Sequence, residues 1–508
     1  MLTLSLGLIA TEALAQGPAV QLTDTLTVDR RTDNRNGDPN DDNYDMIVNR
    51  LNFNGKWGDF SSVNRLDSMY FIGAPTDEFK DDIRLERVGL KYAPGTYTLV
   101  AGDFYRQLGR GIALSLRKVD ELGVDVSLRG GLAEYDGDVM KATVFGGYTN
   151  PANLDWVSLK FVEDSEDLIA GGEYTLRVGE LFDFDRSIDL TMYYVYLQPR
   201  DPILDRPGLD DDQTQTVGGS LDVPELTDWL TFYGEVDYQQ RRLVGDEEDG
   251  TAGFVALNVL QEHYGILFEG LYLDKYELRG GENTATQNRF NYNQPPTVER
   301  FDQEVLNNRD ILGGRIRADL FLLDGDFVPY VNGMHRIVNP DEPGKVKQYH
   351  GYGGFEWRYR QGRARMNLAG GFRDEVQNGR SIKSLRHLDL DYLEPITRSL
   401  AFHMQLYHQF WELEGRKYAR GSSLLAVEWT GVGSATVEVG HDTQNNSEGV
   451  RNSFLAGILV YNPIPEVQLR TIIGNQRGGI KCVAGVCRDF PEFSGLRFQV
   501  IARHNLGT

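Results

Sequence analysis

Apolar residues recur at every second position along much of the chain, and this period restricts the fold more than any other feature of the sequence. Apolar or aromatic side chains take alternate positions between 188 and 196, and they alternate with charged or polar residues in 312–322, 363–373 and 400–410. A period of two places alternate side chains on opposite faces of an extended strand. The pattern therefore predicts many β-strands with one apolar face and one polar face.

The connections between these stretches alternate in length. Short turn signals such as Pro94-Gly95 and Gln361-Gly362 alternate with longer polar segments. The longer segments are 32–44, 149–167, 198–213, 279–310, 339–345, 374–383, 441–452 and 477–493. Placing strands between the connections gives about 24 segments, within a range of roughly 20–26, of about 9–14 residues each, which is the length of a strand that crosses a membrane.

The alternation of short and long connections predicts an all-β fold, a large antiparallel transmembrane β-barrel with short periplasmic turns and longer extracellular loops. Such a sheet must close, because lipid offers no hydrogen-bond partner to an open edge. A soluble sandwich or propeller is the alternative, but its strands average about 5–6 residues. Beyond the N-terminus the chain also lacks a run of about 18 apolar residues, which excludes a helical membrane protein.

Acidic side chains outnumber basic side chains. The 508 residues include 75 Asp and Glu against 52 Lys and Arg, a formal net charge of −23. Because a negatively charged protein is repelled by phosphate, this balance disfavours a nucleic-acid binder. We expect no nucleic acid among the partners of the protein.

Residues 1–15 have the form of an export signal. Residues 2–10 are largely apolar, and Ala13-Leu14-Ala15 is a cleavage site of small residues. A basic n-region is missing, so we expect the printed start of the signal peptide to be truncated. A short buried helix is the alternative. We expect residues 16–508 to form a single outer-membrane β-barrel domain.

Two motifs resemble a known group of proteins. Residues 102–114 read GDFYRQLGRGIAL and are followed by LGVD at 122–125 and LRG at 128–130. The closing stretch 476–488 reads QRGGIKCVAGVCR. Both are similar to motifs of an uncharacterised family of outer-membrane β-barrel proteins of the Bacteroidota and myxobacterial type. The resemblance implies a location and a fold, and it supplies no catalytic residues.

The first motif lies in a candidate constriction, the segment 104–129. Its basic side chains are Arg106, Arg110, Arg117, Lys118 and Arg129. If the segment folds into the barrel, these groups attract anions or bridge carboxylates of the inner wall. The alternative is a structural corner whose arginines pair with wall carboxylates. A barrel of this size is open or plugged, and the segments 104–129 and 279–310 are the candidate plugs.

The alternation also assigns individual side chains to the two faces of the wall. We expect Leu320, Leu368 and Phe402 to face lipid. The side chains expected to face the lumen are Arg315, Arg317, Asp319, Arg363, Arg365, Glu235, Asp237 and Arg497.

Few residues indicate other chemistry. Cys482 and Cys487 lie in the last long connection, and in an oxidising compartment they are expected to form a local disulfide. No His lies between Cys482 and Arg503 to complete a metal site. The oxygen-rich stretch 33–42 lacks the spacing of an EF-hand, which indicates a solvated loop. We predict no metal, no cofactor and no enzymatic activity.

These inferences predict an outer-membrane channel or passive transporter for hydrophilic solutes in a Gram-negative cell. The expected partners are outer-membrane lipid and the barrel insertion machinery. A non-conducting scaffold that docks a periplasmic or surface protein is the alternative. If the segment 104–129 lines the pore, replacing Arg106 and Arg110 by Ala is expected to shift selectivity toward cations.

Overall fold

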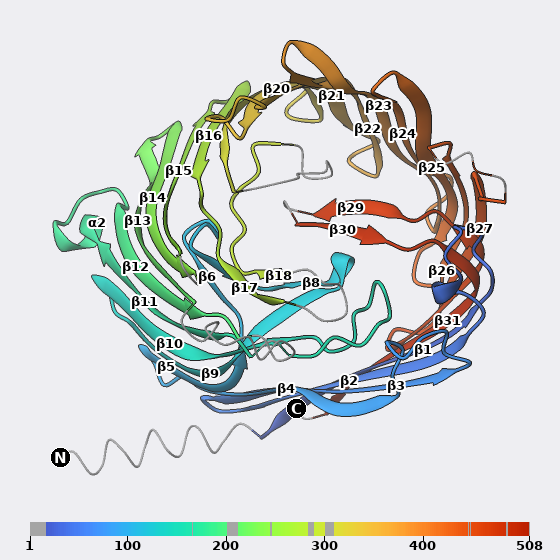
Figure 1. Cartoon of the computed structure of the whole chain (residues 1–508), viewed down its shortest axis with the longest axis horizontal. Helices are drawn as coiled ribbons and strands as arrows, with labels where there is room; N and C mark the ends of the chain where they lie inside the picture. Colours follow the sequence, from blue (N-terminus) through green and yellow to red (C-terminus); the bar gives the residue numbers. More distant parts are fainter. Residues whose placement is uncertain are drawn as a thin grey trace.

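Twenty-four strands form one closed antiparallel β-barrel, as the sequence predicts. The computed structural model describes residues 17–164, 166–200, 212–243, 246–282, 289–299, 309–444, 447, 449–483 and 486–506. The barrel closes where the last strand pairs with the first, from Val20 opposite Leu506 to Arg31 opposite Gly495. Figure 1 looks down the barrel and shows this ring of strands. The expected signal peptide, residues 1–15, lies outside the described residues.

The wall strands follow one another around the ring in sequence order. They are β1 (Ala19–Arg31), β2 (Asp45–Trp57), β3 (Phe60–Ile72), β4 (Asp82–Tyr92), β5 (Tyr97–Phe104), β9 (Val124–Asp136), β10 (Met140–Pro151), β11 (Leu168–Arg177), β12 (Asp189–Gln198), β13 (Gln213–Thr227), β14 (Leu230–Leu243), β15 (Asp246–Leu260), β16 (Tyr264–Asp274), β19 (Ile311–Leu320), β20 (Phe327–Val338), β21 (Val346–Tyr359), β22 (Ala364–Gln377), β23 (Arg380–Pro395), β24 (Leu400–Leu413), β25 (Arg416–Trp429), β26 (Gly433–Asp442), β27 (Ser453–Ile464), β28 (Val467–Gln476) and β31 (Phe493–Leu506).

Seven short strands lie outside this sequence of wall strands. They are β6 (Arg106–Leu108), β7 (Leu114–Leu116), β8 (Lys118–Val119), β17 (Arg279–Glu282), β18 (Arg289–Asn291), β29 (Gly479–Val483) and β30 (Val486–Phe490). Figure 1 shows β6, β8, β17, β18, β29 and β30 inside the ring. The helical turns are η1 (Pro39–Asp41), η2 (Asp120–Leu122) and α2 (Val178–Leu181). Within the described residues, no helix is long and apolar enough to cross a membrane.

The outward face of the wall is apolar, and the inward face is charged. On β19, Ile316 is 53% exposed on the outside, whereas its neighbour Arg315 points inward and contacts Glu269 of β16. Aromatic side chains such as Trp57 and Phe60 are exposed beside the short turns. An apolar outer band with aromatic residues at its rim is the surface of a barrel embedded in lipid.

The expected outward residues lie on this apolar face. Leu320 is exposed and ends β19, so it lies beside the turn to β20 rather than near the middle of the wall. Leu368 pairs with Leu390 of β23, two residues from the exposed Leu388. Phe402 shares the face of β24 that carries the exposed Phe410.

The structure corrects the prediction of a long connection at 374–383. β22 continues to Gln377, and the two-residue turn Asn378-Gly379 leads directly into β23. Both turn residues have positive φ, 50° and 76°, which is the requirement of a type I′ hairpin turn and explains the Asn-Gly pair. Glu414-Gly415 makes the same kind of turn between β24 and β25. The end of the barrel that carries the long loops therefore also has two-residue turns.

Buried apolar clusters inside the ring show where the lumen is filled. The first joins the segment 105–123 to strands β9–β12 and to the segment 275–299, and its buried residues include Leu108, Leu114, Leu128, Ile169, Val195 and Tyr292. The second packs Ile112, at the tip of the segment 105–123, against β14–β16, with Phe254 and Leu273 among its residues. The third packs Leu154 and Leu159 of the loop after β10 against β2 and β3.

Candidate functional site: segments folded into the barrel lumen

The candidate constriction folds into the lumen, which is one of the two arrangements the sequence leaves open, and its inward part has narrower boundaries. β9 begins at Val124, so the inward part is the segment 105–123. Its strands β6 and β7 form a hairpin whose turn contains Gly109 and Gly111, both with positive φ. A Cβ at Gly109 would overlap the carboxylate of Glu235 on β14, and the positive φ of 54° also favours glycine at this position.

Buried ion pairs hold both ends of the inward segment against β3 and β4. Tyr105 donates a hydrogen bond of 2.7 Å to Asp125, which also binds Arg65 and, at 3.0 Å, Arg87. Arg87 in turn contacts Glu86 at 2.6 Å. Because each charge has an opposite partner within hydrogen-bond reach, the network is tolerated in a buried place.

The basic residues of the candidate constriction have different surroundings. Arg106 bridges two carboxylates of the wall, with Glu173 of β11 at 2.8 Å and Glu134 of β9 at 3.8 Å. Arg110 is exposed and stacks over the ring of Tyr233 at 4.4 Å, while its backbone N–H donates to Glu235.

The other three basic residues do not line a common constriction with Arg106. Arg117 hydrogen-bonds Gln294 of the neighbouring inward segment, and Lys118 pairs with Asp120 at 2.8 Å. Arg129 lies on the outward face of β9, opposite the exposed Tyr148, and pairs with Asp103 at 3.0 Å. The segment therefore has a feature of each alternative. It enters the lumen, and its Arg106 pairs with carboxylates of the wall.

The second inward segment, 275–299, is joined to the first through backbone contacts. Ser115 donates its backbone N–H to Tyr292 at 2.6 Å, and Gln294 donates to Gly111 at 2.6 Å. The Tyr292 hydroxyl donates to Asp167 at 2.6 Å. The predicted plug 279–310 thus enters the lumen in its described part, whereas 283–288 and 300–308 lie outside the described residues.

Most wall residues predicted to face the lumen do so. Glu235 and Asp237 are buried on the inner face of β14, and Glu235 accepts hydrogen bonds from Tyr193 and Tyr233. The remaining contacts are Arg315 with Glu269 at 2.6 Å, Arg317 with Asp319 at 2.7 Å, Arg365 with Asp391 at 3.4 Å and Arg497 with Asp29 at 2.7 Å.

Arg363 departs from the prediction. It lies in the turn before β22, exposed, and donates to the carbonyl of Arg360. The strand pattern of β22 begins at Ala364, one residue after Arg363. Arg363 is therefore no part of the inner wall.

A polar cavity of about 630 Å³ lies between the second inward segment and strands β19–β24. Arginines, carboxylates and tyrosines form most of its lining, together with Leu368, Ala369 and Leu390. The lining residues include Glu299, Arg315, Arg317, Tyr330, Tyr352, Glu356, Asp389, Asp391 and Tyr407. The size suits a small solute, and both signs of charge are present.

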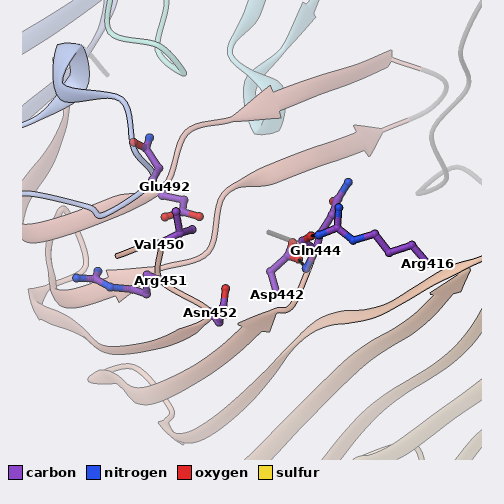
Figure 2. Close-up of a pocket in the computed structure, with 8 residues that line it drawn as sticks. Arg416, Asp442, Gln444, Val450, Arg451, Asn452 and Glu492 are labelled. Carbon is purple, nitrogen blue, oxygen red and sulfur yellow. Dashed lines mark hydrogen bonds between the residues drawn. The ribbon is translucent and has the colours of Figure 1, made fainter. Parts of the chain in front are cut away.

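A smaller cavity of about 340 Å³ lies at the end of the barrel that carries the long loops. Figure 2 shows Glu492, which precedes β31, near Val450 and Arg451, and Asp442 near Gln444 and Arg416. Burial raises the pKa of the Glu492 carboxyl to about 7, while Arg451 opposes the shift. Glu492 is thus a loop group that titrates near neutral pH.

The two cysteines face each other along the backbone. Cys482 of β29 is the direct cross-strand partner of Cys487 of β30, and the side chains of both lie outside the described part of the chain. The disulfide stays a prediction. In the stretch 33–42, Asn34 and Asn36 both donate to Asp41 Oδ2, so this oxygen is used within the loop. The described residues contain no group of three or more His, Cys, Asp or Glu able to hold a metal ion.

Two features of the lumen were missed from the sequence. One is the Arg65–Arg87–Asp125 network, and the other is the contact between His350 and His387. The residues that contact each other lie 37–60 positions apart in the chain, so no short motif joins them. The available signal was weaker, namely charged residues such as Arg65 and Asp67 at inward positions of a predicted strand.

Three solved structures are similar to the chain. The siderophore receptor PirA from Pseudomonas aeruginosa is similar with a TM-score of 0.48 and 9% identity, over 96% of this chain and 80% of that chain. OccK1 (OpdK) from Pseudomonas aeruginosa is similar with a TM-score of 0.43 and 10% identity, over 78% and 99%. The translocation pore of the P pilus usher PapC is similar with a TM-score of 0.39 and 8% identity, over 96% of this chain and 99% of that chain. These likenesses concern the fold alone.

No curated protein matches the sequence of the chain. Residues 20–308, more than half of the chain, match the family of unknown function DUF6029. The match spans both inward segments and the strands from β1 to β16. The chain therefore belongs to the DUF6029 family.

Proposed function

We propose that the protein is a channel for small hydrophilic solutes in the outer membrane of a Gram-negative cell. Support comes from a closed barrel with an apolar outer face and a charged inner face. Lipid would cover the outer face, and the insertion machinery for such barrels would be the partner that places it there. The inner face would remain in contact with water and solute.

One observation carries the proposal, the unequal filling of the lumen. The inward segments pack their apolar residues against β9–β12 and β14–β16, with Ile311 of β19 and Met334 of β20 at the edge, and the loop after β10 packs against β2 and β3. Strands β19–β24 instead line the polar cavity of about 630 Å³. We infer that solutes pass along the β19–β24 side, while the other side is a packed support.

The charges of the cavity predict a weak preference for cations. Four carboxylates line it, Glu299, Glu356, Asp389 and Asp391, against the two guanidinium groups of Arg315 and Arg317. Selectivity depends on the charges beside the narrow path rather than on the net charge of the whole chain. Removing a guanidinium group from the cavity should therefore strengthen the preference.

The test is the reversal potential of the purified protein in planar bilayers under a salt gradient. Arg317→Ala should shift the potential further toward cations, because Arg317 lines the cavity. Arg110→Ala is the matched control, since this exposed arginine lies on the tip of the opposite inward segment. A shift in the Arg110 variant alone would place the path along the hairpin instead.

A non-conducting scaffold is the competing function. The buried ion pairs around Asp125 hold the inward segment in place inside the lumen. A segment held there favours the scaffold, because it blocks part of the lumen. Complete absence of conductance in correctly folded protein would support the scaffold and overturn the channel.

A further inference from the structure

A groove of about 460 Å³ lies on the outer face of the barrel, over β20 and β21 at the top of Figure 1. One row of direct cross-strand partners runs through it. The row begins at Phe268 of β16 and Ile316 of β19, both exposed, and passes through Gly333 of β20 and Gly351 of β21 to the exposed Phe372 of β22. Because the two central positions have no side chains, the row forms a notch between Ile316 and Phe372.

The notch is open at one glycine and partly covered at the other. A Cβ at Gly333 would meet a single atom, 4.0 Å away, whereas a Cβ at Gly351 would come within 3.1 Å of the Phe372 ring. Toward the long loops, the groove ends at the exposed His335, whose ring stacks on that of Tyr349 with the centroids 4.8 Å apart. The groove therefore has an apolar floor with room for a narrow apolar chain.

A cation lies on the outer face beside this groove. Arg386 of β23 is the direct cross-strand partner of Phe372 and of the exposed Phe410 on β24. The Arg386 side chain is exposed, and its guanidinium group lies over the Phe372 ring, 5.3 Å from the centroid. Among the described residues Arg386 makes no ion pair. A guanidinium group on the lipid-facing side of a barrel is unfavourable unless it meets water or an anion.

The neighbouring charges of the outer face do not supply that anion. Asp374 of β22 and Glu412 of β24 lie on either side of β23, each two residues nearer the long loops than the direct partner of Arg386. Glu412 pairs with Lys417 of β25 at 3.8 Å. Lys347 of β21 lies two residues from the direct partner of Asp374. Three cations against two carboxylates leave one positive charge between the groove and the hairpin turns.

We propose that this surface binds one anionic lipid of the membrane, with an acyl chain in the groove and the phosphate at Arg386. The ring of Phe372 joins the two parts, since it covers Gly351 on one side and carries the guanidinium group on the other. A long Arg side chain can keep its stem on apolar surface while its charged head turns toward the interface. Guanidinium and phosphate then form charge-assisted hydrogen bonds.

The site rests on the membrane location proposed above and not on conduction. The groove is continuous with the apolar outer face that lipid would cover, because Ile316 and Phe372 belong to both. An acyl chain joined to a phosphate occurs in phospholipids and in lipid A. Both sources fit the same surface, and the test separates them.

The test is native mass spectrometry of the full chain in detergent with equal amounts of phosphatidylglycerol and phosphatidylcholine of the same chain length. The wild type should retain one phosphatidylglycerol per barrel after phosphatidylcholine has been removed. Gly333→Leu should abolish retention, because its side chain fills the open part of the notch. Arg386→Gln should lower the preference for phosphatidylglycerol about fivefold, the worth of one Arg at an anionic lipid.

Gly457 of β27 provides the matched control. It lies between the exposed Leu455 and Leu459 on the outer face, and a Cβ there would meet a single atom, 3.6 Å away. Gly457→Leu should therefore retain phosphatidylglycerol as the wild type does. Lipid A, added in place of phosphatidylglycerol, identifies the source, since the natural ligand should be the more strongly retained of the two.

Three results would overturn the proposal. Equal retention of both phospholipids by the wild type would do so without any variant, as would identical behaviour of Gly333→Leu and Gly457→Leu. A wild-type dimer that Gly333→Leu dissociates would assign the groove to a second copy of the chain. Failure to insert into lipid nanodiscs would overturn the membrane location as well, whereas absence of conductance alone would concern only the channel.

Discussion

At the scale of single residues, a β-bulge decides which charges enter the lumen. On β4 the register shifts between Arg65 and Leu66 of the neighbouring strand, so that Glu86 and Arg87 are both buried on the inside. Before the bulge Leu85 is exposed, and after it Val88 is exposed. A bulge adds one residue to a strand and changes which alternate residues face inward. Without it, one member of the buried pair would face outward.

The register of β19 gives a direct test at this scale. Ile316→Arg should lower the free energy of unfolding by about 2–4 kcal/mol, because it puts a guanidinium group on the outer face near the middle of the wall. Arg317→Ala, one position away and facing the lumen, should have little effect. Urea unfolding of both variants in lipid vesicles checks this. Equal losses at 316 and 317 would contradict the assignment of the two faces.

Glu492 gives a test of pH dependence. Its folded-state pKa of about 7 lies above the ordinary value of 4.5. Its contribution to the stability of the folded loop is therefore fully present below pH 4.5 and is lost as the pH rises through about 7. Hydrogen exchange in the described loop residues around Glu492 should therefore be faster at pH 8 than at pH 5, after correction for intrinsic rates. Glu492→Gln should remove the difference. An unchanged difference in that variant would assign the effect to another group.

At the scale of elements, the ion pairs at Asp125 clamp the inward segment at both ends. Asp125→Ala should cost about 3–5 kcal/mol, because Arg65 and Arg87 lose a buried partner. Limited proteolysis should then cut the segment 105–123. Asp120→Ala is the control, since its ion pair with Lys118 is exposed and is worth at most about 1 kcal/mol. Cleavage in neither variant would show that the apolar contacts alone hold the segment.

The wall elements could be predicted from the sequence, and the inner elements only in part. Alternation along β19 and β24 specifies strands and faces locally, because each strand repeats the same two-residue period. The inward direction of Gly109 and Ile112 depends instead on contacts with β14–β16, more than 100 residues away in the chain. The pair Asn378-Gly379 is a typical hairpin-turn signal, but the polar residues around it in 374–383 favour the prediction of a long connection.

At the scale of the whole molecule, closure and filling are separate properties. Pairing of β1 with β31 closes the ring, so the wall has no open strand edge. The filling is uneven, with packed segments along β9–β16 and a polar cavity along β19–β24. Closure satisfies the backbone of the wall without an open edge, and uneven filling is what the proposed solute path depends on.

Thiol labelling during single-channel recording tests this account most directly. Cysteine is introduced at Arg317, which lines the cavity, or at Ile316, which faces outward. A charged, membrane-impermeant reagent should reduce the current stepwise in Arg317→Cys and leave Ile316→Cys and the wild type unchanged. A barrel that conducts no current, or equal effects at 316 and 317, would contradict a solute path along β19–β24.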